Sequence, residues 1–199
     1  ETVAAEEATQ PAEVIASGPA SVPAEEAAVD EHKIAELRAL LQQQEDAKRF
    51  HEFVKTLVAL AELVPTSEEK VELLRRAADL YVNKFANQAE AVKAFEQVIA
   101  IDPEHPTASD YLRQMYEKRR DWEKLLNLQR REAERTVSAG DRALKYIEMA
   151  KLATERVKKP ELCIELWTEV LKSDEANVEA LASLSLLYER TKEFDKLAE

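Results

Sequence analysis

Residues 71–103 have the sequence VELLRRAADLYVNKFANQAEAVKAFEQVIAIDP, and this stretch decides the predicted fold. Apolar or small residues recur in it at intervals of three and four, at Leu74, Ala77, Ala78 and Tyr81, and then at Ala91, Phe95, Val98 and Ile99. This spacing places each set on one face of an α-helix. Pro103 ends the second helix, because proline lacks the N–H that a helix interior needs. The stretch therefore predicts two amphipathic helices that pack as a hairpin.

The rest of the chain repeats such features with a step of 72 residues. Three aromatic series show this step: Phe50, Trp122 and Phe194, then Phe95 and Trp167, then Tyr116 and Tyr188. Short segments also recur, since residues 122–125 are WEKL and residues 194–197 are FDKL. A fixed step indicates a repeat architecture, in which each unit buries its apolar face against its neighbours. We expect these rings to be core wedges, each stabilising the array by roughly 1.5–3 kcal/mol through burial.

Helical periodicity extends over most of the sequence, which contains only two glycines. The pattern predicts ten helices, at residues 33–46, 48–64, 67–85, 88–101, 106–118, 121–137, 141–157, 160–173, 177–190 and 193–199. They pair into five hairpins of about 36 residues, the last of them truncated, within a repeat domain at 32–199. Expected boundary signals are a capping box of Thr66 and Glu69, prolines opening helices at Pro106 and Pro160, and a helix stop at Gly140.

Residues 1–31 differ in composition from the repeats. They contain eight Asp or Glu residues and no Lys or Arg, so they supply most of the net charge of −12. Prolines and Gly18 interrupt any amphipathic pattern, and too little apolar surface is present to offset the entropy of ordering. We expect an acidic, disordered tail, which serves as a spacer or alternatively as a recognition arm.

The segment Leu74-x-x-Ala77-Ala78-x-x-Tyr81, followed by the pattern of residues 91–103, resembles the tetratricopeptide repeat (TPR) family. The resemblance covers about residues 34–199 and implies an all-α, right-handed α-solenoid of helical hairpins. The unit at 107–140 departs from the pattern, because Gln129 and Glu132 stand at positions that are usually apolar or small. The half-a-TPR repeats of RNA-processing scaffolds are the nearest competing family.

In TPR proteins the first helix of each hairpin lines a concave groove that binds peptides. Transferring this pattern gives peptide-groove candidates at Arg75, Arg76, Asn83, Tyr111, Gln114, Lys118, Lys151 and Arg190. Some relatives clamp a terminal carboxylate with basic and amide side chains, but Asp79, Thr107 and Tyr111 replace such residues here. The Arg75, Arg76, Tyr111 and Gln114 side chains are expected to hold an acidic or extended peptide, or alternatively to form a solvated helix face.

Several classes of function lack support in the sequence. It contains no phosphate-binding glycine loop, no HExxH motif and no nucleophile elbow, so we expect no enzyme activity and no cofactor. The histidines are not spaced for a metal site. No basic stripe indicates direct binding of nucleic acid, and no apolar run indicates membrane insertion. Cys163 stands alone at a position expected to be buried.

The sequence therefore predicts a scaffold or adaptor that binds a partner's helix or extended segment on its groove within a larger assembly. The alternative is a structural, half-a-TPR-like component that assembles through its terminal helices, with self-association at the C-terminal end. A lone cysteine fits a reducing compartment, so we expect the cytoplasm. The periplasm and other compartments stay open, since the chain begins with Glu1.

Overall fold

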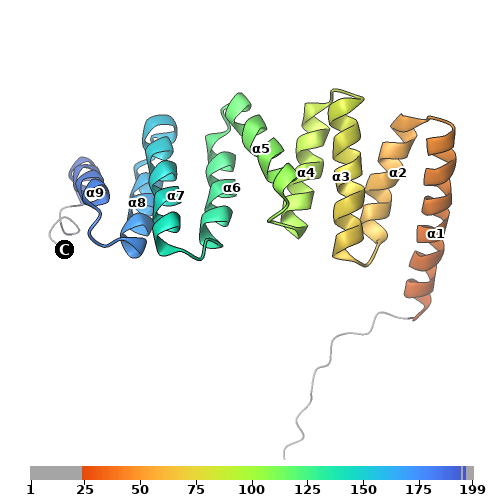
Figure 1. The fold of residues 1–199 in the computed structure, drawn as a ribbon, viewed down its shortest axis with the longest axis horizontal. Helices are drawn as coiled ribbons and strands as arrows, with labels where there is room; N and C mark the ends of the chain where they lie inside the picture. Colours follow the sequence, from red (N-terminus) through yellow and green to blue (C-terminus); the bar gives the residue numbers. More distant parts are fainter. Residues whose placement is uncertain (1–23, 194, 196–199) are drawn as a thin grey trace, which may run out of the picture.

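The structure is a computed structural model that describes residues 24–193 and residue 195, with side chains from residue 30 onward. These residues form nine α-helices and one π-helix, and they contain no strand. The elements are α1 (Ala24–Asp46), α2 (Phe50–Leu63), α3 (Ser67–Asn83), α4 (Gln88–Ile101), α5 (Pro106–Arg119), α6 (Trp122–Glu134), α7 (Ala139–Leu152), η1 (Ala153–Val157), α8 (Pro160–Ser173) and α9 (Val178–Thr191). Figure 1 shows the helices in one elongated row, each packed on the next. The predicted all-α solenoid of TPR-like hairpins is confirmed.

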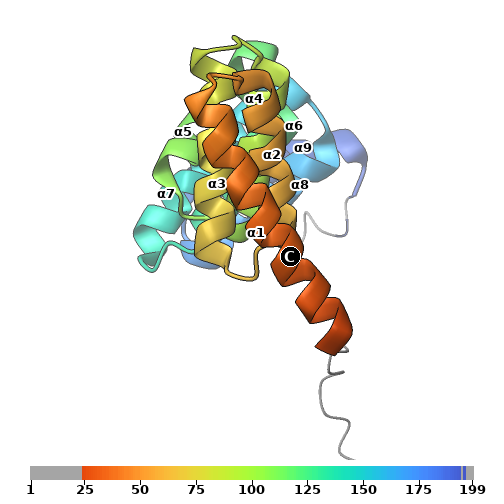
Figure 2. The ribbon, with the colours of Figure 1, turned by 90° about the vertical axis from the view of Figure 1, so that its right-hand side faces the viewer.

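The predicted boundaries from α2 to α9 agree with the structure within a few residues, whereas α1 differs. This helix begins at Ala24, inside the segment that was predicted to be disordered, and it extends beyond the other helices in Figure 2. Residues 24–33 are rich in alanine and glutamate, which favour helix, and the last proline of the segment is Pro23. The predicted tail otherwise lies outside the described residues, as do most residues of the predicted helix at 193–199.

The caps explain where several helices begin. Asn87, Asp121, Ser138 and Asn177 each accept a hydrogen bond from the backbone N–H three residues later. The predicted Thr66 capping box is wrong, because the Thr66 side chain makes no capping hydrogen bond and Glu69 instead accepts one from Arg38 of α1 at 2.7 Å. The predicted stop at Gly140 is also wrong. That glycine lies in the first turn of α7, after the cap at Ser138.

The turns within the hairpins contain residues with positive φ angles that recur every 72 positions. Lys48, Arg120 and Lys192 have φ angles of 55°, 57° and 63°, and Ala86 and Lys158 have φ angles of 49° and 58°. These two sets each repeat at intervals of 72. After each member of the first set, the next backbone N–H donates to a carbonyl five residues back, at 2.8, 2.8 and 3.0 Å. This is a helix C-cap in which a residue with a side chain occupies the left-handed position that usually holds glycine.

The buried side chains form two separate hydrophobic clusters. The first cluster, here called the N-core, extends from Ile34 on α1 to Leu128 on α6. The second, here called the C-core, extends from Leu126 on α6 to Leu187 on α9. Helix α6 therefore contributes two neighbouring faces to the two cores, with Leu125 and Leu128 in the first and Leu126 and Ala133 in the second. Among the described residues, Leu152 is the one partly buried hydrophobic side chain packed against both.

The predicted core position is confirmed for Phe95 and Trp167, whereas Phe50, unlike Trp122, is not among the side chains packed against the N-core. Phe95 and Trp167 are 2% and 3% exposed, in the N-core and the C-core respectively. Phe50 and Trp122 are the first residues of α2 and α6 and are both half-buried. Each lies under a cation of the following hairpin. Lys84 Nζ is 3.0 Å from the Phe50 ring centre, and Arg156 Cζ is 5.8 Å from the Trp122 ring centre. These two cations are also 72 residues apart. Phe194 lies outside the described residues.

Candidate functional site

The structure places the two predicted groove arginines of α3 against different partners. Arg75 donates to Glu72 at 2.7 and 2.9 Å and to Asp79 at 2.7 Å, all on the same helix. The hydrogen bonds from Arg75 lower the pKa of the Glu72 carboxyl, so the pair stays charged. Arg76 lies over the Phe53 ring at 5.4 Å and reaches Glu45 of α1 at 3.3 Å. Both guanidinium groups are thus engaged within the chain.

The other predicted candidates of the first two units do not gather around these arginines. Tyr111 packs on Phe95, with ring centres 4.8 Å apart, and lies at the edge of the N-core. Asn83, Gln114 and Lys118 are exposed on α3 and α5. The predicted cluster of Arg75, Arg76, Tyr111 and Gln114 is therefore not assembled as one side-chain group.

Lys151 and Arg190 are brought together. Both line a groove of about 290 Å³ between α7, η1, α8 and α9, here called the α7–α9 groove. Its apolar lining residues are Trp167, Leu186 and Leu187, of which Leu186 is 68% exposed. The Lys151 ammonium pairs with Glu179 at 2.9 Å, and both side chains are half exposed. The groove therefore combines an apolar floor with a charged rim.

The π-helix η1 forms one wall of this groove. Thr154 and Glu155 of η1 line it, and the Thr154 hydroxyl donates to the Ala150 carbonyl at 2.7 Å. Short π-helical turns are frequent at functional sites in proteins. The widened turn ends at Lys158, whose left-handed backbone starts the path to α8. Sequence reasoning did not predict this element, because the apolar spacing continues through it.

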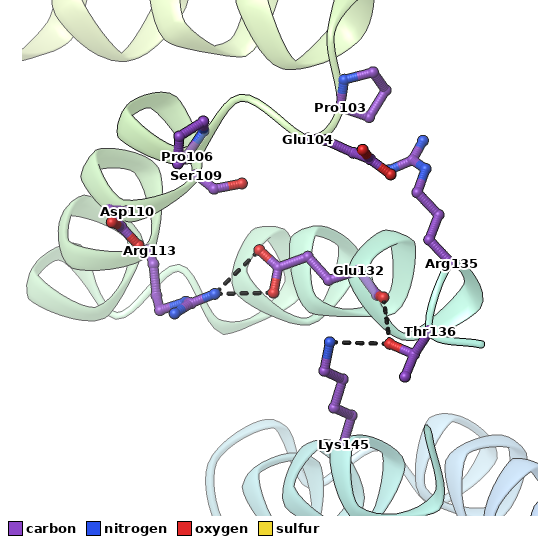
Figure 3. Close-up of a pocket in the computed structure, with 10 residues that line it drawn as sticks. All are labelled: Pro103, Glu104, Pro106, Ser109, Asp110, Arg113, Glu132, Arg135, Thr136 and Lys145. Carbon is purple, nitrogen blue, oxygen red and sulfur yellow. Dashed lines mark hydrogen bonds and ion pairs between the residues drawn. The ribbon is translucent and has the colours of Figure 1, made fainter. Parts of the chain in front are cut away.

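A second, polar hollow of about 300 Å³ lies between α5, α6 and α7, here called the polar pocket (Figure 3). One Nη of Arg113 donates to both carboxylate oxygens of Glu132, at 3.0 and 2.9 Å. Lys145 donates to the Thr136 hydroxyl at 3.0 Å, and that hydroxyl donates to the Glu132 carbonyl at 2.9 Å. A neighbouring hollow shares Arg113, Glu132 and Lys145 and adds Gln129. Charged and polar side chains therefore line the space between α5, α6 and α7, where apolar core side chains would be expected.

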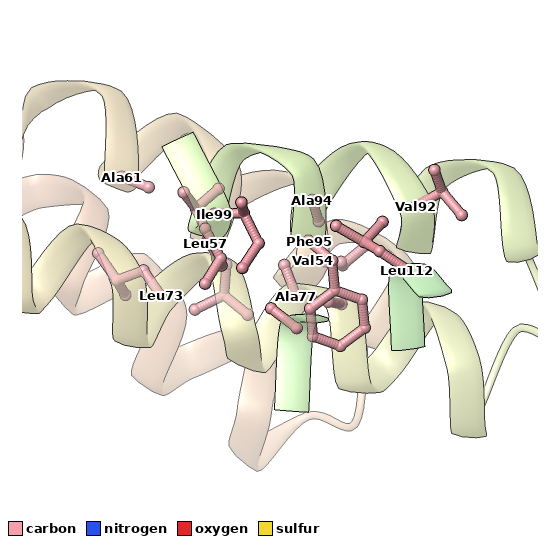
Figure 4. Close-up of a cluster of buried hydrophobic side chains, with 14 of the residues drawn as sticks. Val54, Leu57, Ala61, Leu73, Ala77, Val92, Ala94, Phe95, Ile99 and Leu112 are labelled. Atoms are coloured by element: carbon pink, nitrogen blue, oxygen red, sulfur yellow. The ribbon is translucent and has the colours of Figure 1, made fainter. Parts of the chain in front are cut away.

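For six residues of these two hollows, the residues 72 positions earlier in the chain occupy the equivalent positions of the first unit, and they are apolar. The polar-pocket residues Pro106, Arg113, Glu132, Thr136 and Lys145, with neighbouring Gln129, correspond to Ile34, Leu41, Leu60, Val64, Leu73 and Leu57. All six counterparts are buried in the N-core, and Figure 4 shows Leu57 and Leu73 within it. The step of 72 was visible in the sequence, and comparing residues across it would have revealed the exchange. Of these six residues, the repeat pattern identifies only Gln129 and Glu132 as departures.

The exchange leaves two buried polar atoms without a partner. Arg113 Nε and Gln129 Oε1 have no hydrogen bond, although both atoms are shielded from solvent. An unpaired buried polar group destabilises a fold by about 1–3 kcal/mol. A buried leucine at the same position would have contributed stability instead. The polar pocket is therefore a local weakness in the packing of α5, α6 and α7.

A hydrogen-bonded cluster also fastens α6 to α4 and α5. The Tyr116 hydroxyl and the Lys124 ammonium each donate to Glu96 at 2.8 Å. Burial alone would raise the pKa of Glu96, but these two hydrogen bonds lower it below its ordinary value. Burial and the hydrogen bond to Glu96 raise the pKa of Tyr116. The cluster thus holds a charged carboxylate between two donors at neutral pH.

Cys163 is 2% exposed and belongs to the C-core, as predicted. In the part of the chain that the structure describes, no three His, Cys, Asp or Glu side chains gather where they could hold a metal ion. No helix in that part is long and apolar enough to cross a membrane.

No model of a protein family matches the chain, and no curated protein matches it. Among solved structures, the chain is similar to MamA 41-end from Desulfovibrio magneticus RS-1, with 19% identity, a TM-score of 0.35, and coverage of 83% of this chain and 89% of that one. A crystal structure of MamA is similar with 12% identity, a TM-score of 0.38, and coverage of 83% of this chain and 86% of that one. The P58(IPK) TPR domain is similar with 17% identity, a TM-score of 0.40, and coverage of 87% of this chain and 60% of that one. Because these identities and TM-scores are low, the description of the fold rests on the contacts between this chain's own helices.

Proposed function

We propose that this chain is a protein–protein interaction scaffold that binds a helix or an extended segment of a partner within a larger assembly. A row of hairpins leaves a long surface instead of one enclosed pocket, and such surfaces bind other proteins. The observation that carries the proposal is the α7–α9 groove. Leu186 is 68% exposed there and lines the groove together with Trp167 and the predicted groove residues Lys151 and Arg190.

The chemistry of the α7–α9 groove indicates which segment would fit. An aliphatic side chain of the partner would cover Leu186, since large exposed apolar side chains in a groove are typical anchors. A carboxylate next to it would pair with Arg190, whose planar group forms two parallel hydrogen bonds to carboxylates. Lys151 is held by Glu179 at the rim, where a surface pair of this kind contributes little and exchanges readily. The proposed ligand is therefore a segment with alternating aliphatic and acidic residues.

The test is selection from a phage-displayed library of random 12-residue peptides on the immobilised chain. We expect selected peptides to be enriched in Leu, Ile or Val beside Asp or Glu. Leu186→Asp and Arg190→Glu should each weaken binding of a selected, fluorescein-labelled peptide by about tenfold or more in fluorescence anisotropy.

Leu144→Asp is the matched control, because Leu144 is 61% exposed on α7 and does not line the groove. It should leave the dissociation constant unchanged. Peptides that bind the wild type and both groove variants equally would refute the proposed site. The same far-ultraviolet circular dichroism for all variants would show that each is folded.

A second candidate function is self-association through α9, which is favoured by the exposure of Val178 (79%) and Leu181 (50%). Sedimentation velocity over a hundredfold range of concentration tests it. A sedimentation coefficient that rises with concentration in the wild type, and stays constant in Leu181→Asp, would support this function. A constant coefficient in the wild type would refute it.

A further inference from the structure

We infer that the array bends at α6, so that α1–α5 and α7–α9 move as two bodies about a polar hinge. The first argument is the division of the core. Buried side chains of α1–α5 join Leu125 and Leu128 of α6 in the N-core, and those of α7–α9 join Leu126 and Ala133 on a neighbouring face in the C-core. Leu152 is the one partly buried hydrophobic side chain of the described residues that packs against both, which makes it the pivot. An array with one continuous core would resist bending at every joint.

The second argument is the chemistry of the joint. The three leucines that lock α1 to α2 in the first unit, Leu41, Leu57 and Leu60, are 9%, 0% and 1% exposed. Their counterparts 72 residues later are Arg113, Gln129 and Glu132. Apolar contacts in a core are numerous and short-ranged, so they hold two helices in one arrangement. One ion pair between flexible side chains, bordered by hollows of about 300 and 340 Å³, allows several arrangements.

The third argument is how α6 is fastened on each side. Toward the N-core it is held by Lys124 and Glu96 at 2.8 Å, in addition to the apolar contacts of Leu125 and Leu128. Toward the C-terminal body it is held by Arg130 and Glu165 at 2.7 Å and by the pair of Glu123 and Lys159, in addition to the apolar contacts of Leu126 and Ala133. These pairs lie at the surface, where salt screens them. The relative orientation of the two bodies should therefore depend on ionic strength.

The experiment is single-molecule Förster transfer on the full chain in a Cys163→Ala background. Dyes at Lys55→Cys on α2 and Ser185→Cys on α9 report across α6. Both positions are exposed. Dyes at Lys55→Cys and Ala89→Cys on α4 form the control pair within the first body. We expect the transfer efficiency across α6 to be distributed roughly twofold more widely than in the control pair, because the two bodies reorient.

Raising the salt from about 0.1 M to about 1 M shortens the screening length from about 10 Å to about 3 Å. It should shift the mean transfer efficiency of the pair across α6 and leave the control pair unchanged. Equal widths for the two pairs, together with no shift in salt, would overturn the hinge.

The triple variant Arg113→Leu, Gln129→Leu and Glu132→Leu restores the residues found 72 positions earlier. It should narrow the distribution across α6 to that of the control pair. A distribution that stays wide in the folded triple variant would refute the polar exchange as the origin of the motion. If the triple variant does not fold, the salt titration of the wild type still decides between a hinge and a rigid array.

Discussion

Replacing Trp167 by alanine should destabilise the C-core far more than any surface change on the same helices. Trp167 is 3% exposed on α8, and it packs between α7 and α9. Truncation of a buried tryptophan to alanine costs about 3–5 kcal/mol, because apolar burial is lost and a cavity remains. For a chain of this size, each kcal/mol lowers the melting temperature by about 2–4 °C. The expected decrease is therefore roughly 6–20 °C.

Circular dichroism at 222 nm measures this decrease, and differential scanning calorimetry separates the transitions. Because the N-core and the C-core are separate, the loss should appear in one low-temperature transition that leaves α1–α5 helical. Phe95→Ala, at the equivalent position of the N-core, should shift the other transition. Val137→Ala, at a residue that is 97% exposed, is the control and should change neither. A Trp167→Ala melting curve that superimposes on the wild type would refute the assigned repeat register.

Three further perturbations test other features of the fold. Arg120→Gly should match or exceed the wild-type stability by up to about 1 kcal/mol in urea unfolding, whereas Arg120→Val should lower it, since a β-branched residue resists positive φ. The Glu96 carboxyl has a lowered pKa, so its contribution is present above the ordinary carboxyl pKa and is lost as the pH falls through the folded value. Glu96→Gln should flatten this acid limb of melting temperature against pH, and a limb unchanged in the variant would contradict the assignment. Lys84→Met should lower the melting temperature by about 1–4 °C through the lost contact with Phe50, and no change would show that this contact contributes nothing.

Helical periodicity and the 72-residue step were sufficient to predict the hairpins. The spacing of Leu74, Ala77 and Ala78 is local information, and neighbouring units impose the same burial on each repeat. The start of α1 was missed because alanine and glutamate favour a helix without producing an amphipathic pattern. The left-handed turns were missed because Lys48 and Arg120 carry no composition signal of the kind that glycine gives.

The binding surface was harder to predict than the fold. Transfer of the groove pattern placed Tyr111 on the open face, but Ala108 and Leu112 set the buried stripe of α5, and the Tyr111 ring lies against Phe95. The groove pattern predicts Arg75 as a ligand-binding cation, yet its neighbours Glu72 and Asp79 already hold it. Pairing between charged side chains depends on rotamers, and residue spacing does not determine these.

The recurrence of backbone torsions at Lys48, Arg120 and Lys192 makes the chain modular for protein engineering. Residues 49–120 begin and end in the same geometry as residues 121–192, so an additional copy of either block can be ligated at Arg120 with a matching seam. A duplicated first block would lengthen the rod by α2–α5 and place Leu57 and Leu60 of the copy after Arg113 instead of after Leu41. A duplicated second block would add another α7–α9 groove at a fixed interval, which yields a bivalent molecule from a monovalent one.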